Sequence, residues 1–228
     1  MGRVGVGLDI FKIKAIPTLF WSSPKTLTVK PPLVSFVVLI LGLVLFGLGE
    51  ALLIAAGVGV SPWTVLAQGV SIQTDLSLGT STAIVSSFVL FLWVFLQQTP
   101  GLGTIFNIIV ISIVLDVSVP YLPTFETPIF NMLLAAAGVL LTGFGGAIYL
   151  IANLGPGPRD GLMTGLQRMT GSPIALIRGS IEVTVVLFGA LLGGVVGIGT
   201  LLFAFGIGPA LALSMLLLLK VFDPKHPE

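Results

Sequence analysis

Charged groups are rare inside long apolar segments, and three of the ionisable side chains that lie there in this sequence form the first set of candidate residues. Glu50 lies well within the run 34–56, and Arg178 and Glu182 lie four residues apart within the run 174–194. That spacing places Arg178 and Glu182 on one helical face, where they pair. Because ionisable groups at membrane depth usually face a protein interior or a water-filled cavity, each is a candidate for substrate binding or gating. For the Arg178–Glu182 pair, a purely structural clamp is the alternative.

Two interruptions rich in glycine and proline supply the other candidates. They span 57–64 and 153–161, and in each a proline stands where a new helix would begin. Paired breaks of this kind are typical of transporter binding sites, where the starts of half-helices offer free N–H groups to an anionic solute. The alternative is a pair of ordinary loops outside the membrane, with Thr64 and Asp160 as helix caps. The candidate residues in the breaks are Pro62, Thr64, Pro158, Arg159 and Asp160.

The other residue types leave little room for catalysis or metal binding. The sequence has no cysteine, and its single histidine, His226, lies in the polar tail. Because no set of nucleophile, base or metal ligands converges within the apolar segments, we expect no enzyme activity, no metal and no cofactor. The net charge of +1, without a basic patch interleaved with aromatic residues, predicts no nucleic-acid partner.

The elements that position these residues are membrane helices. Hydrophobic residues make up 55% of the chain, charged residues 8%, and the mean hydropathy is +1.14, so the surface is suited to lipid. A helix needs about 20 apolar residues to cross a bilayer. The sequence therefore predicts an all-α, polytopic membrane protein with six spans, at 34–56, 78–98, 101–122, 129–152, 174–194 and 199–222.

Two shorter segments, 62–76 and 158–171, begin with the prolines of the breaks and resemble helices. Each would reach only about 21 Å, whereas the hydrocarbon core is about 30 Å thick. We interpret them as half-helices that enter and return, or lie buried in protein. If each crossed fully, the chain would have eight spans and parallel repeats.

The chain also matches itself without a gap at an offset of 96 residues. Between 42–115 and 138–211, 18 of 74 aligned pairs are identical, and seven of these are glycines. Clusters of matches at turns in constant register predict two copies of one membrane unit. The charged residues are not repeated: Glu50 is opposite Gly146, and Asp160 is opposite Thr64. Any binding site is therefore expected to be asymmetric.

The distribution of Lys and Arg predicts the topology. Five cations precede the first span, two lie in 153–173 and two lie at the end of the chain, whereas the loops 57–77, 120–128 and 193–198 carry none. With six spans, all cations near a membrane end fall on one side, so we expect both termini in the cytoplasm. Three spans per copy invert the second copy relative to the first. The predicted parts are a basic N-terminal arm (1–33), a first repeat (34–122), a second repeat (129–222) and a tail (223–228).

One group of motifs resembles a known family. They are Gly157-Pro158-Arg159-Asp160-Gly161-Leu162-Met163, Arg178-x-x-x-Glu182, Leu192-Gly193-Gly194, Gly197-Ile198-Gly199-Thr200 and Ile207-Gly208-Pro209, and together they resemble the bacterial YczE-like membrane proteins of the YczE/YyaS/YitT group. The likeness covers nearly all of 35–215 and implies a multi-pass protein of the bacterial cytoplasmic membrane. It implies no reaction. Such proteins typically carry an acid after the Pro-Trp pair of the first repeat, where Thr64 stands here.

The function predicted from these features is a small secondary transporter or permease for a small solute, which the breaks suggest is anionic. The alternative is a membrane accessory or scaffold protein for a biosynthetic or export complex, because some relatives are associated with the making of secondary metabolites. The expected partners are the lipid bilayer and an unknown small solute, and a homo-oligomer is left open.

Overall fold

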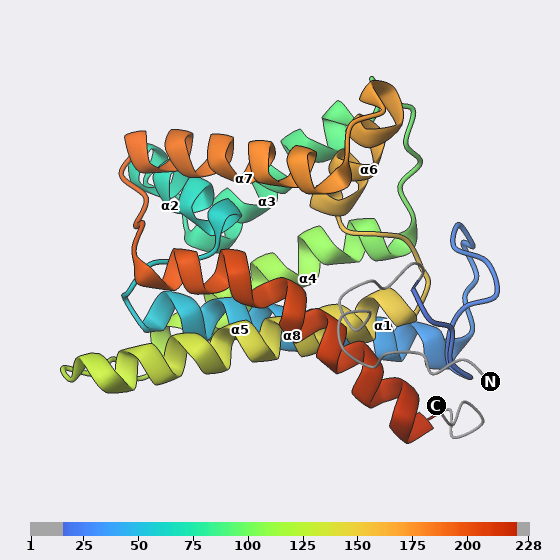
Figure 1. Cartoon of the computed structure of the whole chain (residues 1–228), viewed down its shortest axis with the longest axis horizontal. Coiled ribbons are helices and arrows are strands. Elements are labelled where there is room, and N and C mark those ends of the chain that lie inside the picture. The colour runs from blue at the N-terminus through green and yellow to red at the C-terminus, as the bar shows by residue number, and fades with distance from the viewer. Residues whose placement is uncertain (1–15, 223–228) are drawn as a thin grey trace, which may run out of the picture.

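The computed structural model describes residues 16–222, and helices are the regular secondary structure within that range. Residues 1–15 of the predicted arm and the predicted tail 223–228, with His226, lie outside the described residues. The all-α, polytopic class predicted from the sequence is confirmed (Figure 1). The elements are α1 (Leu33–Ala55), α2 (Pro62–Thr74), α3 (Leu78–Leu92), α4 (Leu102–Ser118), the short 3-10 helix η2 (Val119–Tyr121), α5 (Pro128–Ile151), α6 (Pro158–Thr170), α7 (Ile174–Leu191) and α8 (Ile198–Phe222).

The helices fall into two length classes. Within residues 16–222, five are long and apolar enough to cross a bilayer, namely α1, α4 with η2, α5, α7 and α8. A sixth crossing is made if α2 and α3, which bend by 115° at a short break, count as one span. The helices α2 and α6 have 13 residues each and reach about 20 Å, which is too short to cross alone. The short helices expected after both breaks are therefore confirmed.

The helix α3 ends earlier than the sequence predicts. It stops at Leu92 instead of continuing to 98, and the chain then forms tight turns. Trp93 explains the stop, because its side chain is 1% exposed, packs against Gly161 of α6 and donates its indole N–H to the Pro158 carbonyl over 2.9 Å. A partner 65 residues away thus fixes the end of this helix, which hydropathy alone does not reveal.

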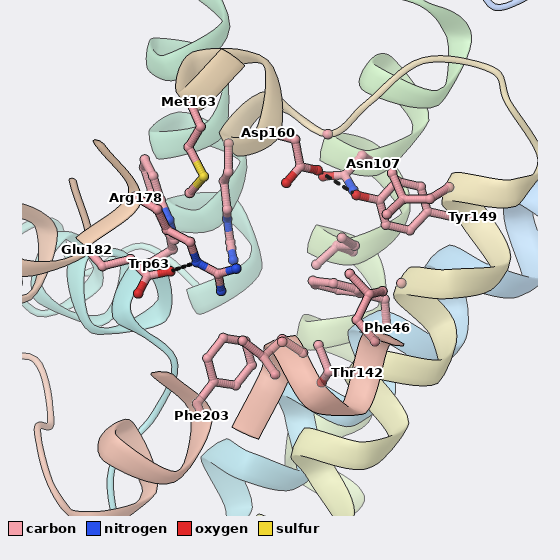
Figure 2. A pocket seen from close by; sticks show the side chains of 18 residues that line it. Phe46, Trp63, Asn107, Thr142, Tyr149, Asp160, Met163, Arg178, Glu182 and Phe203 are labelled. Carbon is pink, nitrogen blue, oxygen red and sulfur yellow. Dashed lines mark hydrogen bonds and ion pairs between the residues drawn. The ribbon is translucent and has the colours of Figure 1, made fainter. Parts of the chain in front are cut away.

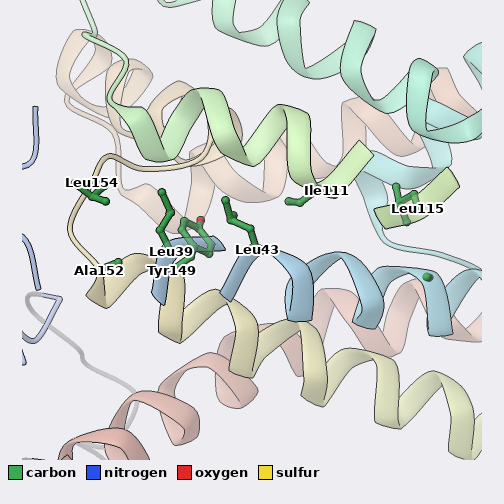
Figure 3. Close-up of a cluster of buried hydrophobic side chains, with 8 residues drawn as sticks. Leu39, Leu43, Ile111, Leu115, Tyr149, Ala152 and Leu154 are labelled. Atoms are coloured by element: carbon green, nitrogen blue, oxygen red, sulfur yellow. The ribbon is translucent and has the colours of Figure 1, made fainter. Parts of the chain in front are cut away.

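The antiparallel pair α1 and α5 forms the centre of the molecule. Gly42 of α1 approaches the backbone of α5 at Gly145, and further along Gly49 approaches Gly138. These small residues let the two helices pack closely, as is common between membrane helices. Leu39 and Leu43 of α1 extend the contact to α4. They form a buried apolar cluster with Ile111 and Leu115 of α4 and Tyr149 of α5 (Figure 3).

Because α1 and α5 are antiparallel, the two breaks lie at opposite ends of this pair (Figure 1). Each break is closed by the turn that opens a helix of the other half. The Gly199 N–H donates to the Val58 carbonyl over 2.8 Å, and the Gly103 N–H donates to the Leu154 carbonyl over 2.6 Å. These two hydrogen bonds are related by the same offset of 96 residues. They satisfy backbone groups that lipid would leave unpaired.

A second set of contacts joins each short helix to the C-terminal end of a helix in the other half, α2 to α7 and α6 to α3. Gly69 of α2 lies against Leu192 at the end of α7, and Gly165 of α6 lies against Leu96 after α3. These contacts too differ by 96 residues in each partner. As Figure 1 shows, α2, α3, α6 and α7 form one layer, and α1, α4, α5 and α8 form the layer beneath it. The candidate pocket lies between these layers.

The described part of the N-terminal arm, 16–32, docks onto the helices. Leu19 and Trp21 are buried against Ile151, Met215 and Leu218 at the ends of α5 and α8. The Ser23 N–H also donates to the Ala152 carbonyl over 2.9 Å. This segment therefore covers the end of the molecule at which the second break lies.

Candidate functional site

A pocket of about 120 Å³ lies where both layers and both halves meet, and it gathers four of the predicted residues. Arg159 and Asp160 reach it from the first turn of α6, and Arg178 and Glu182 reach it from α7. The first half contributes Phe46 from α1, Trp63 from α2 and Asn107 from α4, and α5 and α8 complete the wall (Figure 2). The sequence did not show that α1 and α4 also line this space.

Arg159 and Trp63 are the second residues of α6 and α2, the two helices that begin at the breaks, and they meet at this pocket. The guanidinium carbon of Arg159 lies 5.5 Å from the centre of the Trp63 ring, in a cation–π contact. Trp63 is 6% exposed, so its ring forms a fixed wall. Within residues 16–222, no carboxylate lies within ion-pair distance of Arg159. The two breaks therefore meet at their helix ends, through Arg159 and Trp63.

Arg178 and Glu182 form the ion pair that their spacing predicts. Arg178 Nε donates to Glu182 Oε1 over 2.8 Å, and both side chains are partly exposed to the pocket. Figure 2 shows the pair on the side of the pocket opposite Asp160 and Tyr149. No hydrogen bond joins it to Arg159 or Asp160 among the described residues. The pair neutralises itself, whereas Arg159 has no such partner among residues 16–222.

Asp160 is held by a tyrosine that sequence reasoning missed. The Tyr149 hydroxyl donates to Asp160 Oδ2 over 2.8 Å across the second break. Asp160 Oδ1 accepts no hydrogen bond from residues 16–222, so one oxygen stays available to a donor in the pocket. Asp160 is the third residue of α6, where a helix N-terminus favours negative charge. No pattern in the sequence linked Tyr149 with Asp160.

Glu50 lies outside this pocket in a separate buried cluster. Its side chain is 1% exposed, and its Oε2 accepts hydrogen bonds from Ser61 Oγ over 2.7 Å and from Thr64 Oγ1 over 2.8 Å. The two hydroxyls lie 2.9 Å apart. Glu50 and Thr64 were predicted separately, and the structure joins them through Ser61, which was not predicted. Thr64 therefore binds a carboxyl group and does not cap α2.

The two break prolines have structural positions. Pro62 and Pro158 are the first residues of α2 and α6, where a missing N–H costs nothing. Pro62 is buried, and the Pro158 carbonyl accepts the Trp93 indole N–H. Neither ring offers a polar group to a solute, so of the eight candidate residues these two act through the backbone geometry that they impose.

A second, apolar cavity of about 770 Å³ lies on the other side of Trp63, between α2, α3, α6 and α7. Its rim includes Ile84 and Phe88, which are exposed large apolar side chains. In a bilayer such a surface is covered by lipid tails. Trp63 therefore separates a polar pocket from an apolar one.

Comparison with known proteins gives relatives without an assigned activity. The chain is 41% identical over 197 residues to an uncharacterized protein of Haemophilus influenzae, covering 86% of this chain and 89% of that protein. It is 30% identical over 176 residues to the uncharacterized membrane protein YczE of Bacillus subtilis, covering 76% of this chain and 82% of the relative. No solved structure matches it significantly.

A family model described as a family of unknown function (DUF6198) matches residues 33–215, which include all eight helices except the last turns of α8. The resemblance to YczE-like proteins expected from the motifs is thus confirmed. The apolar helices and the named relative agree on a multi-pass membrane protein. The chain therefore belongs to the DUF6198 family of membrane proteins.

Proposed function

We propose that this protein is a small secondary transporter or permease for a small solute with an anionic group, and that the pocket around Arg159 is its binding site. The observation that carries the proposal is the uncompensated Arg159 guanidinium in a pocket between membrane helices. An unpaired charge at this depth is costly, so a cation retained there is expected to meet an anionic ligand.

The groups around Arg159 define what the solute carries. The first turn of α6 borders the pocket, and its free N–H groups favour the same anionic group as the guanidinium. Asp160 Oδ1 is available to accept a hydrogen bond from the solute. A volume of about 120 Å³ is small beside the roughly 300–1,000 Å³ of pockets for drug-sized ligands. A small acid that also carries a hydroxyl or amino group fits these properties.

The arrangement of the helices supports alternating access. The hydrogen bonds and glycine contacts that recur at an offset of 96 residues are those expected of two copies packed in opposite orientations. The pocket lies between the copies, where rocking of one against the other would open it to either side. A transporter binds its solute and moves it across the membrane without changing it, so we propose no catalytic step. We also propose a bacterial cytoplasmic membrane with both termini in the cytoplasm.

The test is ligand binding to the purified protein in detergent. Small acids with and without a hydroxyl or amino group are added, and the shift in the thermal unfolding midpoint is measured for the wild type, Arg159→Gln and Arg168→Gln. Arg168 is the matched control, because it is an exposed arginine in the last turn of the same helix. We expect at least one acid to stabilise the wild type and Arg168→Gln but not Arg159→Gln.

Equal stabilisation of all three proteins, or of none across the panel, would contradict the proposed site. The accessory alternative predicts a different result. A scaffold protein would co-purify stably with a partner protein, and Arg159→Gln would leave that complex intact.

A further inference from the structure

The cluster of Glu50, Ser61 and Thr64 has a feature that a structural clamp does not require. Glu50 Oε1 is buried and has no hydrogen-bond partner among residues 16–222, while both hydrogen bonds of the carboxyl group fall on Oε2. The three oxygens form a closed triangle with sides of 2.7, 2.8 and 2.9 Å. Each side is short enough to be a hydrogen bond.

The number of hydrogens in this triangle depends on whether the Glu50 carboxyl group is protonated. Each hydroxyl supplies one hydrogen, so an ionised carboxylate leaves one of the three short oxygen contacts without a hydrogen. A proton on Oε2 fills it and reverses the contact in which Ser61 donates to an ionised Glu50: Glu50 then donates to Ser61, Ser61 donates to Thr64, and Thr64 donates to Glu50. The same proton removes the negative charge that an ionised group would leave on the unpartnered Oε1.

No other group in the described structure neutralises Glu50. The helices around it carry few ionisable side chains: α5 has Tyr149, α4 has Asp116 and α2 has none. Tyr149 donates to Asp160, and Asp116 accepts from Ser77 and from the Gly79 N–H, so both are engaged elsewhere. No lysine or arginine of residues 16–222 lies within ion-pair distance of Glu50.

We propose that Glu50, Ser61 and Thr64 form a proton-binding site, and that this proton is the coupling ion of the transporter. The binding site stands on the geometry above, whereas its coupling role rests on the proposed transport function. Two neighbouring residues link it to the pocket. Trp63, on which Arg159 stacks, directly precedes Thr64 in α2. Phe46 lies one helical turn before Glu50 in α1 and lines the pocket.

Release of the proton breaks the ring of hydrogen bonds. A buried carboxylate then needs water or a new donor, which requires the start of α2 to move away from α1. That movement carries Trp63 with it and changes the wall against which Arg159 is held. Occupancy of the pocket and protonation of Glu50 are thereby coupled, and the coupling is reciprocal.

The proton is detected directly by infrared spectroscopy of the purified protein near neutral pH. We expect a carbonyl stretching band of a protonated carboxyl group in the wild type that is absent in Glu50→Gln. Glu126→Gln is the matched control, since it makes the same change at an exposed carboxyl group in the loop before α5, and it should keep the band. Glu50→Gln should fold, because its amide N–H can donate to Ser61 in place of the proton.

If Glu50→Gln does not fold, Ser61→Ala serves instead and should shift the frequency of the band. A spectrum without the band in the wild type, a band unchanged by both substitutions, or a band abolished by added Na⁺ would overturn the proton site.

Coupling is then measured in proteoliposomes that contain a pH-sensitive dye. An acid that stabilises the wild-type protein should drive proton movement with the wild type and Glu126→Gln, but not with Glu50→Gln. Solute movement without proton movement would overturn the coupling role. Absence of any solute movement would contradict the transport proposal instead, and the infrared band would still decide the proton site.

Discussion

At the residue scale, the polar groups of the pocket divide into satisfied partners and one cation left for a ligand. Arg178 is matched by Glu182 over 2.8 Å, and Asp160 is matched on one oxygen by Tyr149 over 2.8 Å. Arg159 has an aromatic ring beside it, and no carboxylate of residues 16–222 lies within ion-pair distance of it. In the proposed transporter, this division would give binding to Arg159 and positioning to Tyr149.

The Tyr149 hydroxyl is expected to hold the start of α6 in place. Tyr149→Phe removes one hydrogen bond to a carboxylate and should lower the free energy of unfolding by about 1–2 kcal/mol. Tyr121→Phe is the control, because Tyr121 is 86% exposed on η2. The measurement is the unfolding midpoint of both variants in detergent. An equal effect of the two substitutions would show that the Asp160 contact contributes nothing to stability.

At the scale of elements, the breaks depend on two glycines that no other residue type can replace. Gly59 has a φ of 108° and Gly155 a φ of 111°, backbone conformations that side chains with a Cβ rarely adopt. A Cβ on Gly155 would also meet the backbone of Gly101 at 2.9 Å. The second break packs against the start of α4 only if residue 155 both adopts this positive φ and leaves room for Gly101.

Gly155→Ala should therefore destabilise the protein far more than Gly→Ala at a position that also has a positive φ but has space for a Cβ. Gly171, at the end of α6, has a φ of 68° and nothing within 4 Å of an added Cβ. Gly171→Ala should cost only the backbone strain, about 1 kcal/mol. We expect Gly155→Ala to lower the yield of folded protein and its unfolding midpoint well beyond this. Similar behaviour of the two variants would mean that the contact with Gly101 is unimportant.

The contact between α6 and the end of α3 gives a second prediction for elements. A Cβ on Gly161 would collide with the Trp93 ring, so Gly161→Ala should destabilise the protein. Trp93→Leu alone should also destabilise, because it leaves a cavity and an unpaired Pro158 carbonyl. If the two side chains compete for one space, the double variant should lose less than the sum of the single losses. Additive losses in unfolding midpoints would contradict direct contact.

At the scale of the whole molecule, the ends of the helices lie as the proposed topology requires. The start of α1 and the end of α8 lie at the same end of the structure (Figure 1). The loop between α6 and α7 lies at that end too, and the loop between η2 and α5 lies at the other. This agrees with the side on which the cations of the sequence gather.

The absence of native cysteine makes the topology easy to test. We expect a cysteine at Ser172 to react with a membrane-impermeant maleimide only when the cytoplasmic face is exposed, and a cysteine at Thr124 to react from the opposite side. Both positions lie in loops, and Thr124 is exposed. Labelling of both positions from one face would contradict six crossings with inverted halves.

Much of the framework follows from local properties of the sequence. Hydropathy predicted the spans, and Gly-x-x-Pro predicted both breaks and the short helices at Pro62 and Pro158, because these signals act within a few residues. The hydroxyl of Ser61, the Tyr149–Asp160 bond and the early end of α3 at Trp93 were missed. Each depends on a partner in another element, which neither composition nor spacing specifies.

Solute uptake is the most direct test of the central claim, that Arg159 binds a small anion on its way across the membrane. Proteoliposomes with wild type, Arg159→Gln or Arg168→Gln are given a radiolabelled small acid that stabilises the purified wild-type protein. The account predicts uptake above empty liposomes for wild type and Arg168→Gln, and at least a tenfold loss for Arg159→Gln, which corresponds to about 1.4 kcal/mol. Equal uptake by all three proteins, or none above empty liposomes, would contradict it.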